Sequence, residues 1–170
     1  MKSTPHREPP WNLETDASVL VARPPGRGQG GPAVPIAGGG IVLRDPSLKV
    51  VEARSIVLGA TESPTHAEYA ALLAGLRIAH GHGVEHLRIR NDNLSLVRNL
   101  TGRPEGAAKD MEPAFREILE LRSRFLTFDL RWAASSHAAE RGNGQPTADL
   151  LARRAIGLGP RPVRRRRGRG

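Results

Sequence analysis

The sequence predicts an α/β domain, of the α+β kind, in which helices flank a mixed five-stranded sheet. In the first half of the chain, strand-like segments follow one another with turn residues between them, which is typical of antiparallel hairpins. In the second half, strand-like segments alternate with helix-like ones, which is typical of βα crossovers. The element order β-β-β-α-β-α-α-β-α therefore predicts one sheet with helices packed on it.

Length and composition narrow the class of protein. The chain of 170 residues is long enough to bury one core and too short for two comfortable domains. It contains no apolar run of about 18 residues, so we expect no membrane span. The absence of cysteine excludes disulfides and thiolate metal sites. The first residues lack the apolar stretch of a signal peptide. We therefore expect a cytoplasmic monomer, and nothing in the sequence implies a protein partner.

The positive charge is concentrated at one end of the chain. Residues 153–170 contain eight arginines and no acidic residue, whereas the rest of the chain is nearly neutral within a net charge of +9. We divide the chain into a flexible lead-in (1–10), a folded domain (11–157) and a disordered arginine-rich tail (158–170). Such a tail suggests a polyanion partner, and the alternative is a solvated tail without a specific role. The candidate nucleic-acid contacts in it are Arg164, Arg165, Arg166 and Arg167.

The first half of the chain supplies the first three strands. Residues 11–21 alternate as a strand, and the segment 22–39, dense in Gly and Pro, predicts a loop. Strands are expected over 39–44 and 50–58. The turn residues 45–47 between them predict an antiparallel hairpin.

The clearest helix of the sequence covers residues 63–80. Ser63 or Thr65 can cap its first turn, and Pro64 suits the first helical position. Glu68 is expected near the helix start, beside the apolar stripe. From this segment alone, Glu68 either serves a capping box with Thr65 or belongs to a functional site. The apolar residues three or four apart are Tyr69, Leu72, Leu73 and Leu76.

The second half alternates two further strands with three helices. The fourth strand ends at Asp92, and a short helix with inward-facing leucines follows it. The last helix is expected to place Asp149 in its first turn. The expected elements are strands over 85–91 and 127–133 and helices over 93–100, 110–124 and 146–156.

Four acidic residues fall where this plan brings chain segments together. Asp16 lies on the first strand, Glu68 on the first helix, Asp92 at the end of a crossover strand and Asp149 on the last helix. Crossover strands present their carboxyl ends to one crevice, where ligands bind. Carboxylates that meet there repel one another unless a cation holds them ionised. Oxygen ligands suit Mg²⁺ or Mn²⁺, and such a pocket can hold two ions for phosphodiester hydrolysis.

Four sequence patterns occur in order on these elements. They are T-D-A-S (15–18), H-A-E-Y-x-A-L-L-A-G-L (66–76), R-N-D-N-x-x-L-V-x-x-L (90–100) and A-D-L-L-A (148–152). Together they resemble ribonuclease H of type 1, closest to its compact bacterial, archaeal and plant-like branch. The resemblance extends from Trp11 to about Ile156.

This resemblance implies a ribonuclease H-like sheet of order 3-2-1-4-5 and a metal-dependent endoribonuclease. Such an enzyme hydrolyses the RNA strand of RNA/DNA hybrids with two Mg²⁺ or Mn²⁺ ions. The resemblance assigns the catalytic and metal-binding roles to Asp16, Glu68, Asp92 and Asp149, and it favours the metal role of Glu68 over the capping role.

The sequence also departs from the family pattern. The loop histidine of the family corresponds to His137, in an unusual setting, so His137 is either an assisting group or an uninvolved one. Ala17 follows Asp16 where the family has glycine, and Pro64-Thr65 stand where the family has an asparagine pair. Thr65 and Asn93 remain candidate nucleic-acid contacts. These departures leave two alternatives open: a binding module without cleavage, or a related nuclease with another nucleic-acid substrate.

Overall fold

The computed structural model describes residues 8–22, 34–102, 112–133 and 145–159. Within these residues it has five strands and four helices in the expected order. The strands are β1 (Trp11–Ala22), β2 (Val34–Arg44), β3 (Val50–Ala60), β4 (His86–Asn91) and β5 (Thr127–Trp132). The helices are α1 (Pro64–Gly81), α2 (Leu94–Thr101), α3 (Glu112–Arg122) and α4 (Ala148–Ala155).

The five strands form one sheet in the order β3-β2-β1-β4-β5. β1 and β3 both pair with β2 in antiparallel fashion, whereas β4 pairs in parallel with β1 and with β5. The sheet is therefore mixed, and the predicted fold class and strand order are confirmed. The long strand β1 lies at the centre and joins the antiparallel half to the parallel half.

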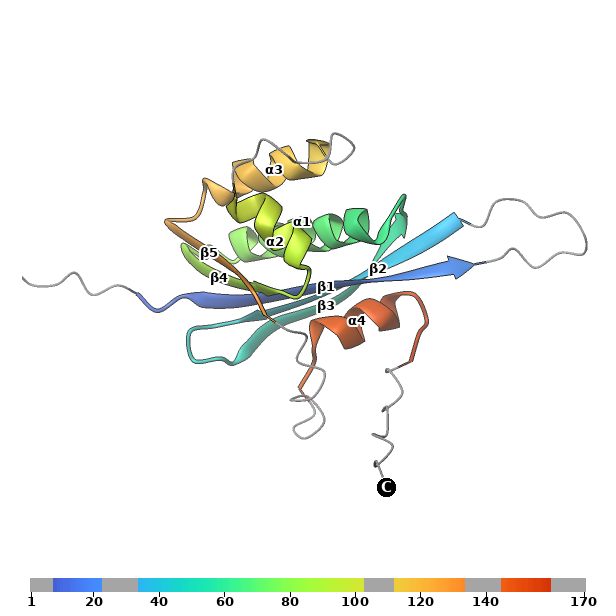
Figure 1. Ribbon diagram of the computed structural model, residues 1–170. Helices are drawn as coiled ribbons and strands as arrows, with labels where there is room; N and C mark the ends of the chain where they lie inside the picture. The colour runs from blue at the N-terminus through green and yellow to red at the C-terminus, as the bar shows by residue number, and fades with distance from the viewer. Residues whose placement is uncertain (1–7, 23–33, 103–111, 134–144, 160–170) are drawn as a thin grey trace, which may run out of the picture.

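Helices cover both faces of the sheet. α1, α2 and α3 lie on one face and α4 on the other, as Figure 1 shows. On the first face, a Cβ placed on Gly75 of α1 would lie 2.8 Å from Cγ2 of Thr15, so α1 lies almost directly on β1. Side chains alternate along a strand, and Asp16 therefore points toward the face that carries α4. The core between sheet and α1 is formed mainly by Leu13, Ile41, Leu43, Leu72, Leu76, Leu87 and Ile89.

The helix α1 forms as the sequence predicts. Of the two candidate caps, Ser63 takes the role: its Oγ accepts a hydrogen bond from the N–H of His66 at 3.2 Å, and Pro64 opens the helix. Tyr69, Leu72 and Leu76 are almost fully buried, which confirms the predicted apolar face. No helix in the described part of the chain is long and apolar enough to cross a membrane.

The predicted loop over 22–39 is wrong at both ends. β1 runs through Ala22, and β2 begins at Val34, which pairs with Ala22. The glycines that favoured a loop serve packing, because a Cβ on Gly38 would lie 2.4 Å from the carbonyl oxygen of Ala152 in α4. Glycine in this strand therefore gives α4 room to lie on the sheet. Residues 23–33 lie outside the described part of the chain.

Candidate metal centre

The candidate site lies beside the part of β1 that extends beyond the end of β4. The parallel pairing of these strands extends from Trp11–Leu87 to Glu14–Arg90, and β4 ends at Asn91. β1 continues to Ala22, paired with β2. The edge of β1 beyond Glu14 therefore adjoins the carboxyl end of β4, which is where parallel strands present ligand-binding groups.

Three of the predicted carboxylates meet at this place. Asp16, Glu68 and Asp92 each contribute one carboxylate oxygen to a group whose atoms all lie within 4.8 Å of one another. The side chains of Asp16 and Glu68 are buried, each with 9% of its residue surface exposed, whereas Asp92 is exposed. The cluster is therefore buried at Asp16 and Glu68 and open to solvent at Asp92.

Glu68 was expected near the start of α1 and lies just past its first turn. The first turn of α1 contains no acidic residue, so the capping interpretation is wrong. The side chain reaches across to β1 instead, where Oε1 accepts a hydrogen bond from the N–H of Ala17 at 3.3 Å. This contact ties α1 to β1 beside Asp16.

The environment of Glu68 disfavours its negative charge. Burial, together with the charges of Asp16 and Asp92, raises the pKa of Glu68 to about 8, while the N–H of Ala17 and the side chain of Asn91 act in the opposite direction. Oε2 of Glu68 is buried and has no hydrogen-bond partner among the described residues. A divalent cation would neutralise this repulsion and give Oε2 a partner. The three oxygen donors fit a hard ion such as Mg²⁺ or Mn²⁺.

Two residues beside the cluster were not predicted. Nε1 of Trp132, at the end of β5, donates a hydrogen bond to the carbonyl oxygen of Asp92 at 3.1 Å. Asn91 is 2% exposed and lies against β1 next to the carboxylates. The strand pattern contained a signal for Asn91, because Leu87 and Ile89 occupy the same buried face and a polar residue there needs partners.

The remaining predicted site residues surround this group or fall outside the described part of the chain. Asp149 is half-buried in the first turn of α4, which Thr147 caps, and it is not a member of the 4.8 Å group. Thr65 lies in the first turn of α1. Oδ1 of Asn93 caps α2 by accepting from the N–H of Leu96 at 3.0 Å. His137 and Arg164 to Arg167 lie outside the described residues.

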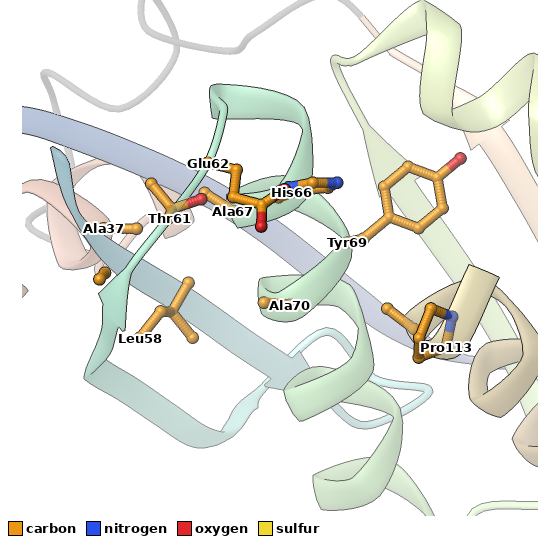
Figure 2. Close-up of a pocket in the computed structure, with 11 residues that line it drawn as sticks. Ala37, Leu58, Thr61, Glu62, His66, Ala67, Tyr69, Ala70 and Pro113 are labelled. Atoms are coloured by element: carbon orange, nitrogen blue, oxygen red, sulfur yellow. The ribbon is translucent and has the colours of Figure 1, made fainter. Parts of the chain in front are cut away.

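A separate pocket of about 320 Å³ lies between α1, the start of β2, the end of β3 and the start of α3. Figure 2 shows the aromatic ring of Tyr69 and the imidazole of His66 beside it. Its polar rim includes Glu62, whose Oε2 lies 3.4 Å from Nδ1 of His66. None of the three clustered carboxylates lines this pocket, so it is distinct from the candidate metal centre.

Comparisons with known structures agree with this architecture. The chain is similar to ribonuclease H1 of the halophilic archaeon Halobacterium salinarum, with a TM-score of 0.67 and 23% identity over 86% of this chain and 96% of that one. It is similar to LC11-RNase H1, solved in complex with an RNA/DNA hybrid, with a TM-score of 0.65 and 21% identity over 86% and 96%. It is also similar to a foamy viral protease-reverse transcriptase structure in complex with dsDNA, with a TM-score of 0.64 and 19% identity over 87% and 94%.

Sequence comparison gives the family directly. No curated protein matches the chain. A family model described as reverse transcriptase-like matches residues 33–141, a segment that includes Glu68 and Asp92. The chain therefore belongs to the reverse transcriptase-like family and has the ribonuclease H-like fold.

Proposed function

We propose that this protein is a metal-dependent endoribonuclease that hydrolyses the RNA strand of RNA/DNA hybrids. The observation that carries the proposal is the group formed by Asp16, Glu68 and Asp92 within 4.8 Å, in a ribonuclease H-like fold. The LC11-RNase H1 structure, which contains an RNA/DNA hybrid, supports this choice of substrate.

In this proposal, Asp16, Glu68 and Asp92 hold Mg²⁺ or Mn²⁺, and Asp149 completes a site for two ions. The bound ions would supply an activated water and stabilise the leaving oxygen of the phosphodiester. The protein's own part is to hold the oxygen ligands in place. Asp16 sits on the central strand, and the Ala17 N–H orients Glu68.

Nucleic acid would approach from the open side of the cluster. Asp92 is exposed there, and Trp132, half of whose surface is exposed, holds its backbone carbonyl. Asn93 follows Asp92 directly. Since Oδ1 of Asn93 is engaged in capping α2, its amide N–H₂ is the group that we propose donates to the substrate. Thr65, in α1, is proposed to contact the same nucleic-acid strand as Asn93.

The proposal is tested by a cleavage assay on a labelled RNA/DNA hybrid, with the wild type beside Asp92→Asn. We expect Mg²⁺- or Mn²⁺-dependent cutting of the RNA strand by the wild type and a loss of at least about 100-fold in the variant, because the amide cannot supply the negative charge. Asp129→Asn, which removes a carboxylate on β5 that pairs with Arg131, is the matched control and should cut normally. A folded wild type that cuts no nucleic acid would favour a binding module.

A second candidate keeps the chemistry and changes the substrate. It is favoured by Pro64-Thr65, which replace the asparagine pair of the resembled family, and by the similar foamy viral structure that contains dsDNA. Matched hybrid, RNA duplex and DNA duplex substrates of one sequence separate the two candidates. Cleavage of the RNA duplex at a rate similar to that of the hybrid would support the second.

The arginine-rich tail is proposed to bind phosphates of the nucleic acid. Deleting residues 163–170 should weaken hybrid binding and lower the slope of log affinity against log salt by roughly 0.9 for each phosphate that the tail neutralises, because the shortened protein releases fewer counterions. Binding titrations at several salt concentrations measure this slope. An unchanged slope would mean that the tail does not touch the nucleic acid.

A further inference from the structure

Asn91 is a polar residue at a position that the strand pattern reserves for an apolar one. It is the last residue of β4, and it shares the inward face with Leu87 and Ile89, both fully buried. Its own exposure is 2%. A buried amide costs free energy unless its hydrogen bonds are made, so its partners explain why it is tolerated.

The partners of Asn91 lie immediately beside two of the clustered carboxylates. Its Nδ2 donates to the backbone oxygen and to Oγ1 of Thr15, each at 3.3 Å, and Thr15 precedes Asp16. Its Oδ1 accepts from the N–H of Asn93 at 2.8 Å, and Asn93 follows Asp92. One side chain therefore connects the residue before one carboxylate to the residue after the other.

This side chain acts where the backbone ladder between β1 and β4 stops. The last paired residues of the two strands are Glu14 and Arg90. Toward β5, the backbone oxygen of Asn91 accepts a hydrogen bond from the N–H of Ala133 at 3.1 Å. A side chain of the same shape without polar atoms would fill the space, but it would leave the turn that carries Asp92 without its link to β1.

We infer that Asn91 is a positioning residue that fixes Asp92 relative to Asp16 and thereby sets the affinity of the centre for divalent ions. The inference rests on the proposed function, because it concerns the same metal centre. Asn91 therefore affects the binding of metal ions by the protein in the absence of nucleic acid. Binding of the nucleic acid at saturating metal should be little affected.

The test compares Asn91→Leu with Asn99→Leu. Asn99 is a half-buried asparagine of α2 whose Nδ2 donates to Oη of Tyr69 at 3.3 Å, so its replacement also removes an amide and one hydrogen bond. Calorimetric titration with Mg²⁺ and Mn²⁺, without nucleic acid, gives the metal affinity. We expect a loss of about 10–100-fold for Asn91→Leu, as for residues that orient metal ligands, and less than about twofold for Asn99→Leu. The KM for hybrid at saturating metal should be unchanged in both variants.

Other outcomes separate this inference from its rivals. Lower thermal stability of Asn91→Leu with wild-type metal affinity would show a purely structural role and overturn the inference. If Asn91→Leu does not fold, Asn91→Ser replaces it in the test, because the serine hydroxyl can still accept a hydrogen bond from the N–H of Asn93. We expect a smaller loss of metal affinity in Asn91→Ser. A metal affinity equal to that of the wild type would overturn the inference. If the wild type binds metal but cuts no hybrid, the proposed function is wrong. A lower metal affinity of Asn91→Leu than of the wild type would still support the inference about Asn91.

Discussion

Replacing Glu68 by glutamine is expected to stabilise the metal-free protein and to abolish its response to Mg²⁺. Burial and the neighbouring Asp16 and Asp92 raise the pKa of Glu68 to about 8. The unfolded chain releases this proton near the ordinary pKa of 4.5, whereas the folded protein retains it until about pH 8. Stability from this group is therefore fully present below pH 4.5 and is lost as the pH rises toward 8.

The size of this effect makes it measurable by thermal unfolding. In the absence of divalent ions, the loss between pH 5 and 8 is on the order of 3 kcal/mol, or roughly 10 °C in Tm. Glutamine keeps an oxygen for the N–H of Ala17 without the charge, so the variant should lack this part of the pH dependence and have the higher Tm at pH 8. Mg²⁺ should raise the Tm of the wild type only, since it binds the ionised cluster.

The control for Glu68→Gln is Glu85→Gln, which neutralises an exposed carboxylate just before β4. It should follow the wild type in both pH dependence and Mg²⁺ response. Superimposable curves of Tm against pH for wild type and Glu68→Gln would mean that Glu68 ionises normally in the folded protein. The repulsion between the clustered carboxylates, which a bound cation would relieve, would then be absent.

Gly40→Ala should destabilise the domain by displacing α4. A Cβ on Gly40 would lie 1.8 Å from the carbonyl oxygen of Ala148 and 2.6 Å from the backbone nitrogen of Ala152. These are backbone atoms of a helix, so they can yield only if the whole helix moves away from β2. We expect a loss of about 3 kcal/mol or more in the free energy of unfolding, measured by denaturant titration.

Gly39→Ala is the matched control on the opposite face of the same strand. There the added Cβ would lie 3.1 Å from Cγ1 of Ile56 and 3.2 Å from Cδ1 of Leu58, which are side-chain atoms that can adjust. Its expected effect is within about 1 kcal/mol. Equal losses in the two variants would contradict the packing argument. Because α4 carries Asp149, Gly40→Ala should also lose cleavage activity if Asp149 completes the metal site.

Local sequence patterns predicted much of the architecture. The spacing of apolar residues and the Ser63-Pro64 start were sufficient for α1, because helix caps and amphipathic periodicity are local properties. The turn between β2 and β3 also followed from local chemistry: Oδ1 of Asp45 accepts from the N–H groups of Ser47 and Lys49 at 2.9 and 3.0 Å. The meeting of Asp16, Glu68 and Asp92 followed from their places on these elements and from the family resemblance.

Features that depend on distant parts of the chain were not predictable in this way. The start of β2 was predicted too late, at residue 39, because Gly38 was interpreted as part of a loop, whereas it leaves room for α4, more than 100 residues later in the chain. Glu68 was expected near the start of α1, whereas it lies just past the first turn because Ser63 and not Thr65 caps the helix. The role of Asn91 depends on its hydrogen bonds to Thr15 in β1, and no pattern within β4 identifies β1 as its neighbour.

Asp16 lies within a long strand and Asp92 follows the end of a short one, so the two carboxylates differ in their resistance to local opening. Asp16 lies in the middle of the pairing between β1 and β2, which extends from Asn12 to Ala22, and a residue in that position separates only when much of the sheet comes apart. Asp92 follows the last residue of β4 and is exposed, so fraying of a strand end is enough to move it. Fluctuations of the native state should therefore open the cluster from the Asp92 side first, which makes ligand exchange compatible with an otherwise rigid domain.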